Sequence, residues 1–222
     1  MILSMLKLSR ADCNALNIKD IYSIHKVIYS LFPQPDNENT QQQKEEQPYG
    51  NKPHTDKAEK LSSRDFLFVD KGGDFHAREI LILSLSQPAL PEYGEISSKI
   101  IPESFLQMDN YGFEVVLNPV KRDNKSGKLI SVRGRQNLLQ WFIDKTEKGE
   151  LGFTVDSKTL QVNREGVLRY QKNGATCTHN TATFKGKLKV TDRSKFIQTF
   201  EKGIGRAKGF GFGLLQIVPI TI

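Results

Sequence analysis

The chain has few of the residues that build disulfide frameworks, metal centres or membrane spans. Its two cysteines, Cys13 and Cys177, fit neither a disulfide scaffold nor a zinc site. No run of about 18 apolar residues occurs, so we expect no membrane-spanning helix and no membrane partner. Residues 1–8 are too short to form a signal peptide. These absences predict a cytoplasmic protein, because a reducing compartment keeps thiols unpaired.

Clusters of acidic residues at metal-binding spacing are also missing. This absence argues against a nuclease that uses two metal ions, since such sites need several converging carboxylates. We therefore expect no metal and no cofactor.

The charges that are present are unevenly distributed. The chain has a net charge of +7, yet residues 1–120 carry a net −5 and residues 121–222 a net +12. A half-chain this basic builds a positive field whose usual partner is a polyanion, so we expect binding to nucleic acid. An acidic protein or an anionic membrane surface is the alternative, although no basic amphipathic helix supports the membrane.

Residues 1–108 predict a first domain with the ferredoxin-like order β-α-β-β-α-β. The predicted elements are a strand over residues 1–8, a helix opened by Asn17 and running to Leu31, strands over 66–69 and 77–85, a helix over 93–100 and a short strand at 105–106. Residues 34–63 are polar and lack periodicity, so we expect a flexible surface insertion.

Residues 109–222 predict a second domain of the same kind. The predicted strands cover residues 113–120, 151–155, 168–170, 182–190 and 214–218, and the predicted helices cover 134–146 and a segment capped by Thr191 or Asp192. The fold class is therefore α+β, with two tandem ferredoxin-like (RRM-like) domains and antiparallel sheets.

A glycine-rich loop over residues 203–213 reads GIGRAKGFGFG, between the last predicted helix and strand. Glycine lets backbone amides approach an anion closely. The segment is neither a Walker loop nor a dinucleotide fingerprint. The candidate phosphate contacts in it are Gly203, Gly205, Gly209, Gly211, Arg206 and Lys208. A tightly packed structural turn is the alternative interpretation.

The first predicted helix carries a histidine between two tyrosines. Tyr22, His25 and Tyr29 are spaced by three and four residues, so they line one edge of the helix beside its apolar face. Histidine exchanges a proton near neutral pH, and a tyrosine hydroxyl can orient it or a phosphate. Spacing alone equally fits a packed or surface histidine. His76, in a strand context, and His179, in a predicted loop, are interpreted as structural.

Three segments in this order resemble the CRISPR repeat-RNA endoribonuclease of type I-E systems, the CasE family. They are IYSIHKVIYSLFP at residues 21–33, VLNPVK at 116–121 and GIGRAKGFGFGLLQIVP at 203–219. The resemblance covers nearly the whole chain. It implies two ferredoxin-like domains that bind a CRISPR repeat RNA stem-loop and cut at its 3′ base without metal. It also implies that the enzyme stays on its product with the other subunits of the type I-E surveillance complex.

The resemblance implies roles for individual residues. His25 matches the family's catalytic histidine and Tyr22 the tyrosine one turn before it, while Lys26 falls where a basic residue contacts RNA. The segment RYQKNG at 169–174 looks like a basic hairpin laid along the RNA stem, which makes Arg169 and Lys172 binding candidates. Such an enzyme uses the RNA's own 2′-hydroxyl as nucleophile, with His25 as general base or general acid.

Two other functions compete with this interpretation. A non-catalytic tandem ferredoxin-like RNA-binding subunit would explain the charge, but it would not need a proton donor beside Tyr22. A small-molecule enzyme on the same fold would leave the basic half of the chain unexplained. Base stacking in the manner of conventional RRM domains fits poorly, because the middle strands are mainly aliphatic.

Overall fold

A computed structural model of the chain describes residues 1–32, 66–74, 76–172 and 174–220. The predicted insertion at 34–63 lies outside the described residues. The elements of the first half are β1 (Ile2–Ser9), α1 (Arg10–Ala15), α2 (Ile21–Ser30), β2 (Phe66–Gly73), β3 (Ala77–Ser84), β4 (Glu95–Ile100) and a 3₁₀ helix, η1 (Glu103–Leu106).

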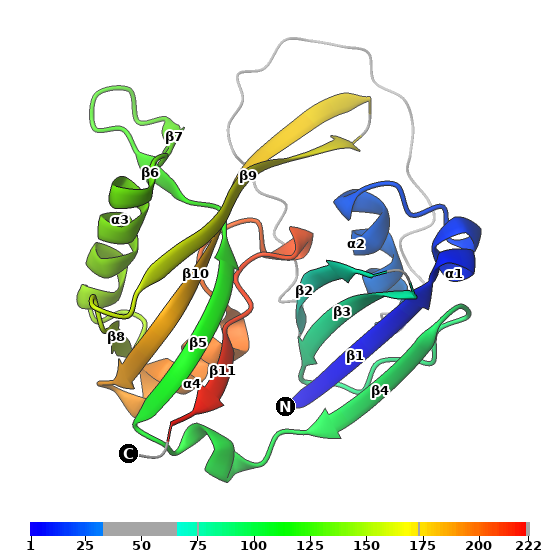
Figure 1. Ribbon diagram of the computed structural model, residues 1–222, viewed down its shortest axis with the longest axis horizontal. Helices are drawn as coiled ribbons and strands as arrows, with labels where there is room; N and C mark the ends of the chain where they lie inside the picture. Colours follow the sequence, from blue (N-terminus) through cyan, green and yellow to red (C-terminus); the bar gives the residue numbers. More distant parts are fainter. Residues whose placement is uncertain (33–65, 75, 173, 221–222) are drawn as a thin grey trace, which may run out of the picture.

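The first sheet is antiparallel, with the strand order β2-β3-β1-β4 (Figure 1). Alternate residues of β1, among them Leu6 and Leu8, are buried, as a strand with one covered face requires. They pack in one cluster with Ile24 and Ile28 of α2 and with Phe68 of β2. The buried face of β1 and the apolar face of α2 thus pack against each other in one core. This packing fixes the orientation of α2.

Three predictions for the first half are wrong in detail. Residues 95–100 form strand β4 rather than a helix, and the predicted strand at 105–106 is the 3₁₀ helix η1. Pairing with the open edge of β1, including a hydrogen bond between the hydroxyls of Ser4 and Ser98, outweighs the weak local helix preference. The helix is capped by Asp20 rather than Asn17, because Asn17 adopts a positive φ in the turn after α1.

The elements of the second half are β5 (Asn110–Leu117), β6 (Val120–Arg122), β7 (Leu129–Ser131), α3 (Arg135–Glu147), β8 (Phe153–Val155), β9 (Gln161–Lys172), β10 (Ala175–Val190), α4 (Arg193–Lys202), a second 3₁₀ helix, η2 (Lys208–Phe210), and β11 (Gln216–Pro219). Their sheet has the order β11-β5-β10-β8, with β9 paired to β10. The four strands of each sheet, leaving out β9, can be numbered 1 to 4 in the order in which they occur in the chain. With this numbering, both sheets have the same spatial order, 4-1-3-2. The predicted repeat of architecture is confirmed.

Strands β9 and β10 extend beyond the second sheet as a long hairpin (Figure 1). The hairpin reaches across to the first half, where Tyr170 of β9 packs in the same cluster as α2. The predicted strands at 168–170 and 182–190 are therefore parts of longer strands. The small sheet β6–β7 was not predicted, since all its residues but the half-buried Val120 are exposed and they show no apolar alternation.

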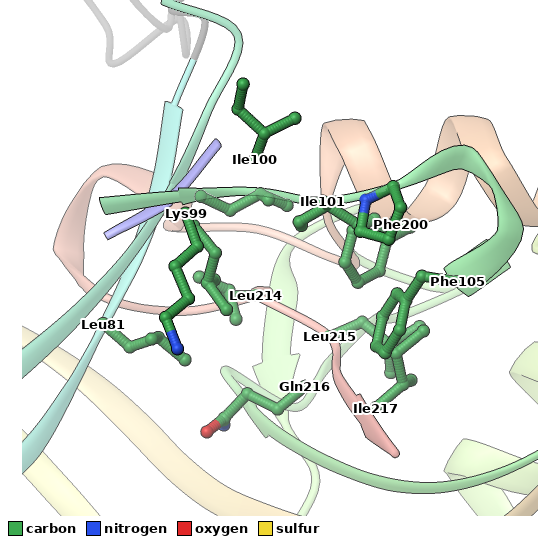
Figure 2. A pocket seen from close by; sticks show the side chains of 13 residues that line it. Leu81, Lys99, Ile100, Ile101, Phe105, Phe200, Leu214, Leu215, Gln216 and Ile217 are labelled. Carbon is green, nitrogen blue, oxygen red and sulfur yellow. The ribbon is translucent and has the colours of Figure 1, made fainter. Parts of the chain in front are cut away.

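The two halves share a core. Leu67, Val69 and Leu83 of the first sheet belong to the same buried cluster as Val115 and Leu117 of β5. An apolar pocket of about 250 Å³ lies between the halves, with Leu81, Lys99 and Ile217 among its lining side chains (Figure 2). None of the predicted site residues lines this pocket. The predicted division at residues 108 and 109 falls between η1 and β5 and stays a prediction.

Candidate active site

Helix α2 holds His25 at the boundary between core and surface. The helix begins at Asp20, whose carboxylate accepts a hydrogen bond from the backbone N–H of Ser23 at 2.9 Å. Ile24 and Ile28 point into the core, so Tyr22 and His25 occupy the neighbouring edge and are half-buried. A histidine in this position keeps contact with solvent while its ring is held by packing.

The glycine-rich loop meets this histidine. His25 Nδ1 lies 2.6 Å from the carbonyl oxygen of Gly209, a residue 184 positions along the chain. A carbonyl oxygen only accepts, so Nδ1 carries the proton of this hydrogen bond. In the neutral ring Nε2 is then the nitrogen without a proton. The structure thus brings together two segments that the sequence singled out separately.

Aromatic rings surround the imidazole. Phe210 stacks on it with ring centroids 5.1 Å apart, Tyr29 lies at 4.0 Å and Tyr22 at 5.7 Å. The Lys26 ammonium group sits 4.8 Å from the centroid of the Tyr22 ring, which places a cation at the exposed end of the cluster. This arrangement fixes the plane of the imidazole and leaves positive charge beside it.

A second histidine, interpreted from the sequence as structural, lies behind this cluster. His179 is not in a loop but in β10, and its Nε2 lies 3.0 Å from the hydroxyl of Tyr170. Its Nδ1 lies 3.3 Å from the amide nitrogen of Asn118. Burial lowers the pKa of His179 and raises the pKa of Tyr170, so both groups are neutral near pH 7. The sequence offered no direct signal for this contact, because Tyr170 is paired with Cys177 and meets His179 diagonally across the two strands.

The predicted cations differ in their surroundings. Lys26, Arg169 and Arg206 are exposed. The Lys208 ammonium group donates to the carbonyl of Lys202 at 2.7 Å, and burial, together with nearby lysines, lowers the pKa of Lys208. Lys172 pairs through its backbone with Ala175 at the end of the β9–β10 hairpin. Contacts of all five residues with RNA stay predictions.

The glycines of the loop have conformational reasons to be glycine. Gly203, Gly205 and Gly211 have positive φ values of 73°, 80° and 80°. A Cβ at Gly203 would lie 2.8 Å from a methyl carbon of Leu67, whereas one at Gly209 would make an ordinary contact of 3.6 Å with Cε1 of His25, so packing does not require glycine at position 209. Tight packing, the alternative interpretation of the loop, therefore applies to part of it. Contact of these glycines with RNA stays a prediction.

Two absences concern only the part of the chain that the structure describes. There, no three His, Cys, Asp or Glu side chains come together in a group that could bind a metal ion. No described helix combines the length and apolar character needed to cross a bilayer. Cys13 and Cys177 are each half-buried and are not joined to one another.

Comparisons with known proteins extend over nearly the whole chain. Residues 1–219 match a family model described as CRISPR associated protein. The chain is 23% identical over 212 residues to the CRISPR system Cascade subunit CasE of Escherichia coli K12, covering 91% of this chain and 94% of the relative. It is 24% identical over 115 residues to the CRISPR-associated endoribonuclease Cse3 of Thermus thermophilus, covering 48% of this chain and 54% of the relative.

Solved structures give the same result for the fold. A CRISPR endoribonuclease Cse3 bound to a 19-nucleotide RNA has a TM-score of 0.75 at 19% identity, covering 99% of this chain and 100% of the other. The CRISPR-associated protein Cas6e from Escherichia coli K-12 has a TM-score of 0.68 at 20% identity, with the same coverage. The predicted fold class, two tandem ferredoxin-like domains, is confirmed.

Proposed function

Because the chain belongs to the CRISPR-associated protein family, we propose that it is a metal-independent endoribonuclease that cuts CRISPR repeat stem-loops in precursor RNA. Its relatives include proteins named as an endoribonuclease and as a Cascade subunit. The product is a mature guide RNA, which the enzyme continues to hold as a subunit of the type I-E surveillance complex in the cytoplasm. Residues 1–108 supply the catalytic helix, and residues 109–222 supply the basic surface and the glycine-rich loop.

One observation supports the catalytic role most directly: the hydrogen bond between His25 Nδ1 and the Gly209 carbonyl. A surface histidine without a role needs no partner from the other half of the chain. This bond sets the tautomer, while the same loop carries Arg206 and Lys208. The loop thus orients a proton-transfer group and carries cations close to it. A non-catalytic RNA-binding subunit does not require an oriented histidine.

The proposed reaction is the metal-free RNA cleavage that the family resemblance implies, and the geometry around His25 supports it. The 2′-hydroxyl of the substrate attacks the adjacent phosphorus, a P–O2′ bond forms and the P–O5′ bond breaks. The proton of the 2′-hydroxyl goes to a base and the 5′ oxygen takes up a proton. His25 Nε2 serves as one of these two groups. Tyr22 orients the histidine or the phosphate, and Lys26 stabilises the extra negative charge of the transition state. The products are a 2′,3′-cyclic phosphate and a 5′-hydroxyl.

The test is incubation of the purified protein with a hairpin RNA from its own genome's repeat, in the presence of a chelator. We expect one discrete cut with a 2′,3′-cyclic phosphate end. The matched control RNA carries a single 2′-deoxy nucleotide at the cut position, and it should bind equally well but stay intact because its nucleophile is missing. Retention of the all-ribose RNA without any cut would identify a binding subunit and overturn the enzymatic assignment.

Replacement of Arg206 by Gln should weaken RNA binding in a salt-dependent manner. Removal of a single ionic interaction with a phosphate lowers the slope of log K against log salt concentration by about one. We therefore expect the slope for the uncleavable hairpin to flatten by about one in Arg206→Gln. Lys158→Gln provides a control, since it removes an exposed charge from the turn between β8 and β9. An unchanged slope in Arg206→Gln would remove Arg206 from the RNA interface.

A further inference from the structure

Phe210 is stacked between the catalytic candidate and the β9–β10 hairpin. One contact is with the His25 ring, at a centroid distance of 5.1 Å and an interplanar angle of 19°. Another is with the ring of Tyr170, at 4.7 Å and 28°. Phe210 directly follows Gly209, whose carbonyl accepts the hydrogen bond from His25. The position of the Phe210 ring therefore constrains the position of that carbonyl.

The loop that carries the Gly209 carbonyl is rich in glycine, so its amino-acid composition does not make its backbone rigid. Glycine has more accessible backbone conformations than any other residue, and three glycines flank Gly209 within four positions on either side. Backbone preference alone would leave the Gly209 carbonyl with several orientations. The backbone hydrogen bonds of η2 shape the turn around Gly209, and the stacked Phe210 ring fixes this turn against His25 of α2.

Tyr170 is itself held in place by hydrogen bonds. It is buried, with 5% of its surface exposed, and its hydroxyl lies 3.0 Å from His179 Nε2. The amide nitrogen of Asn118 faces His179 Nδ1 and can only donate, so the neutral ring carries its proton on Nε2 and donates it to Tyr170. His179 also meets the Phe210 ring, with centroids 5.7 Å apart. Strands β9 and β10 thus lock the tyrosine ring against Phe210.

We propose that Tyr170 and His179 are positioning residues, which hold Phe210 so that the Gly209 carbonyl keeps His25 in its Nδ1–H tautomer. The inference rests on the proposed function. Neither residue needs to touch RNA in this role, because each acts through the loop. A misplacement of about 1 Å at a reacting group can cost about 100-fold in rate. Loss of the contact between Tyr170 and His179 should therefore slow RNA cleavage while the affinity for RNA stays the same.

The first test is Tyr170→Phe, which keeps the ring and removes only the hydroxyl. We expect the single-turnover cleavage rate, measured at saturating enzyme, to fall about tenfold. The Kd for the hairpin with a 2′-deoxy cut site should stay unchanged. Tyr111→Phe is the matched control, because Tyr111 is also buried and its hydroxyl also donates a hydrogen bond, to the carbonyl of Phe105 far along the second sheet. It should cleave at the original rate.

A spectroscopic measurement separates positioning from a general loss of stability. The chain has only four histidines, so nitrogen-15 spectra of histidine-labelled protein can resolve the His25 ring, identified by its absence in His25→Ala. We expect the Nδ1–H form in the unchanged protein and a mixture of tautomers in Tyr170→Phe. Phe210→Leu, which keeps bulk but removes the stacked ring, should give the same mixture and a rate loss of about 100-fold. Phe210→Tyr should restore both readouts.

These experiments distinguish the positioning role of Tyr170 and His179 from the proposed enzymatic function. If His25→Ala abolishes cleavage and Tyr170→Phe changes neither rate nor tautomer, the positioning role is wrong and the proposed function stands. If His25→Ala cleaves normally, the catalytic assignment itself fails. If Tyr170→Phe lowers RNA affinity to the same degree as the rate, Tyr170 belongs to the binding surface, and the positioning role is again overturned.

Discussion

Replacement of His25 by alanine should lower the rate of repeat RNA cleavage by about 10²–10⁴, the range that a positioned acid or base contributes. RNA binding should persist, because the substitution leaves in place the cations predicted to contact RNA, which are Lys26 on the same helix and those of the hairpin and the loop. The measurement is a single-turnover time course on the hairpin RNA, with the Kd determined separately on the uncleavable RNA. Such a split between rate and affinity is the signature of a group that acts in the transition state.

His76→Ala is the matched control for this experiment. His76 is exposed in the turn before β3, on a different element from His25. Its removal should leave the rate unchanged. Cleavage at the original rate by His25→Ala would remove the imidazole from the mechanism and return His25 to a packing role.

Replacement of Gly213 by alanine should destabilise the protein by about 3 kcal/mol or more. Gly213 has a φ of 88°, and an added Cβ would lie 2.6 Å from the carbonyl oxygen of Ile204. The same residue donates its N–H to Val116 and accepts from the N–H of Ile204, each at 2.9 Å. The clash is with backbone, so no side-chain rotation relieves it. Thermal and denaturant unfolding give the magnitude, and RNA cleavage should fall with the folded fraction.

Gly205→Ala separates the two causes of this loss. Gly205 has a similar φ of 80°, but a Cβ there would meet only a methyl carbon of Leu117, at an ordinary 3.8 Å. Only the backbone strain remains, which costs about 1–2 kcal/mol. Equal destabilisation by the two substitutions would show that positive φ, rather than the close approach to Ile204, is what requires glycine at position 213.

Elements with strong local signals were predictable from the sequence. Strand β3 is an almost continuous apolar run and lies inside its sheet, as a strand covered on both sides does. Helix α4 was predicted with Thr191 or Asp192 as its cap. In the structure the cap is Asp192, whose carboxylate accepts from the N–H of Lys195 at 3.0 Å. In these elements the preferences of neighbouring residues and the final fold agree.

Elements that depend on distant pairing were not predictable in the same way. Strand β4 is extended because it pairs with β1, although its own residues Ser97 and Ser98 carry no strand signal. The candidate site shows the same limit. Spacing along α2 predicted that Tyr22 and His25 share an edge, whereas the contact with Gly209 arises only when the two halves pack together.

The order in which the chain is made gives that contact a further consequence. A ribosome synthesises the imidazole of His25 early, and 184 residues later it adds the carbonyl that orients it. A nascent chain therefore carries the histidine without the carbonyl that selects its Nδ1–H tautomer. Under the proposed mechanism, RNA cleavage should therefore begin only after the ribosome has added residue 209 and the loop has packed against α2.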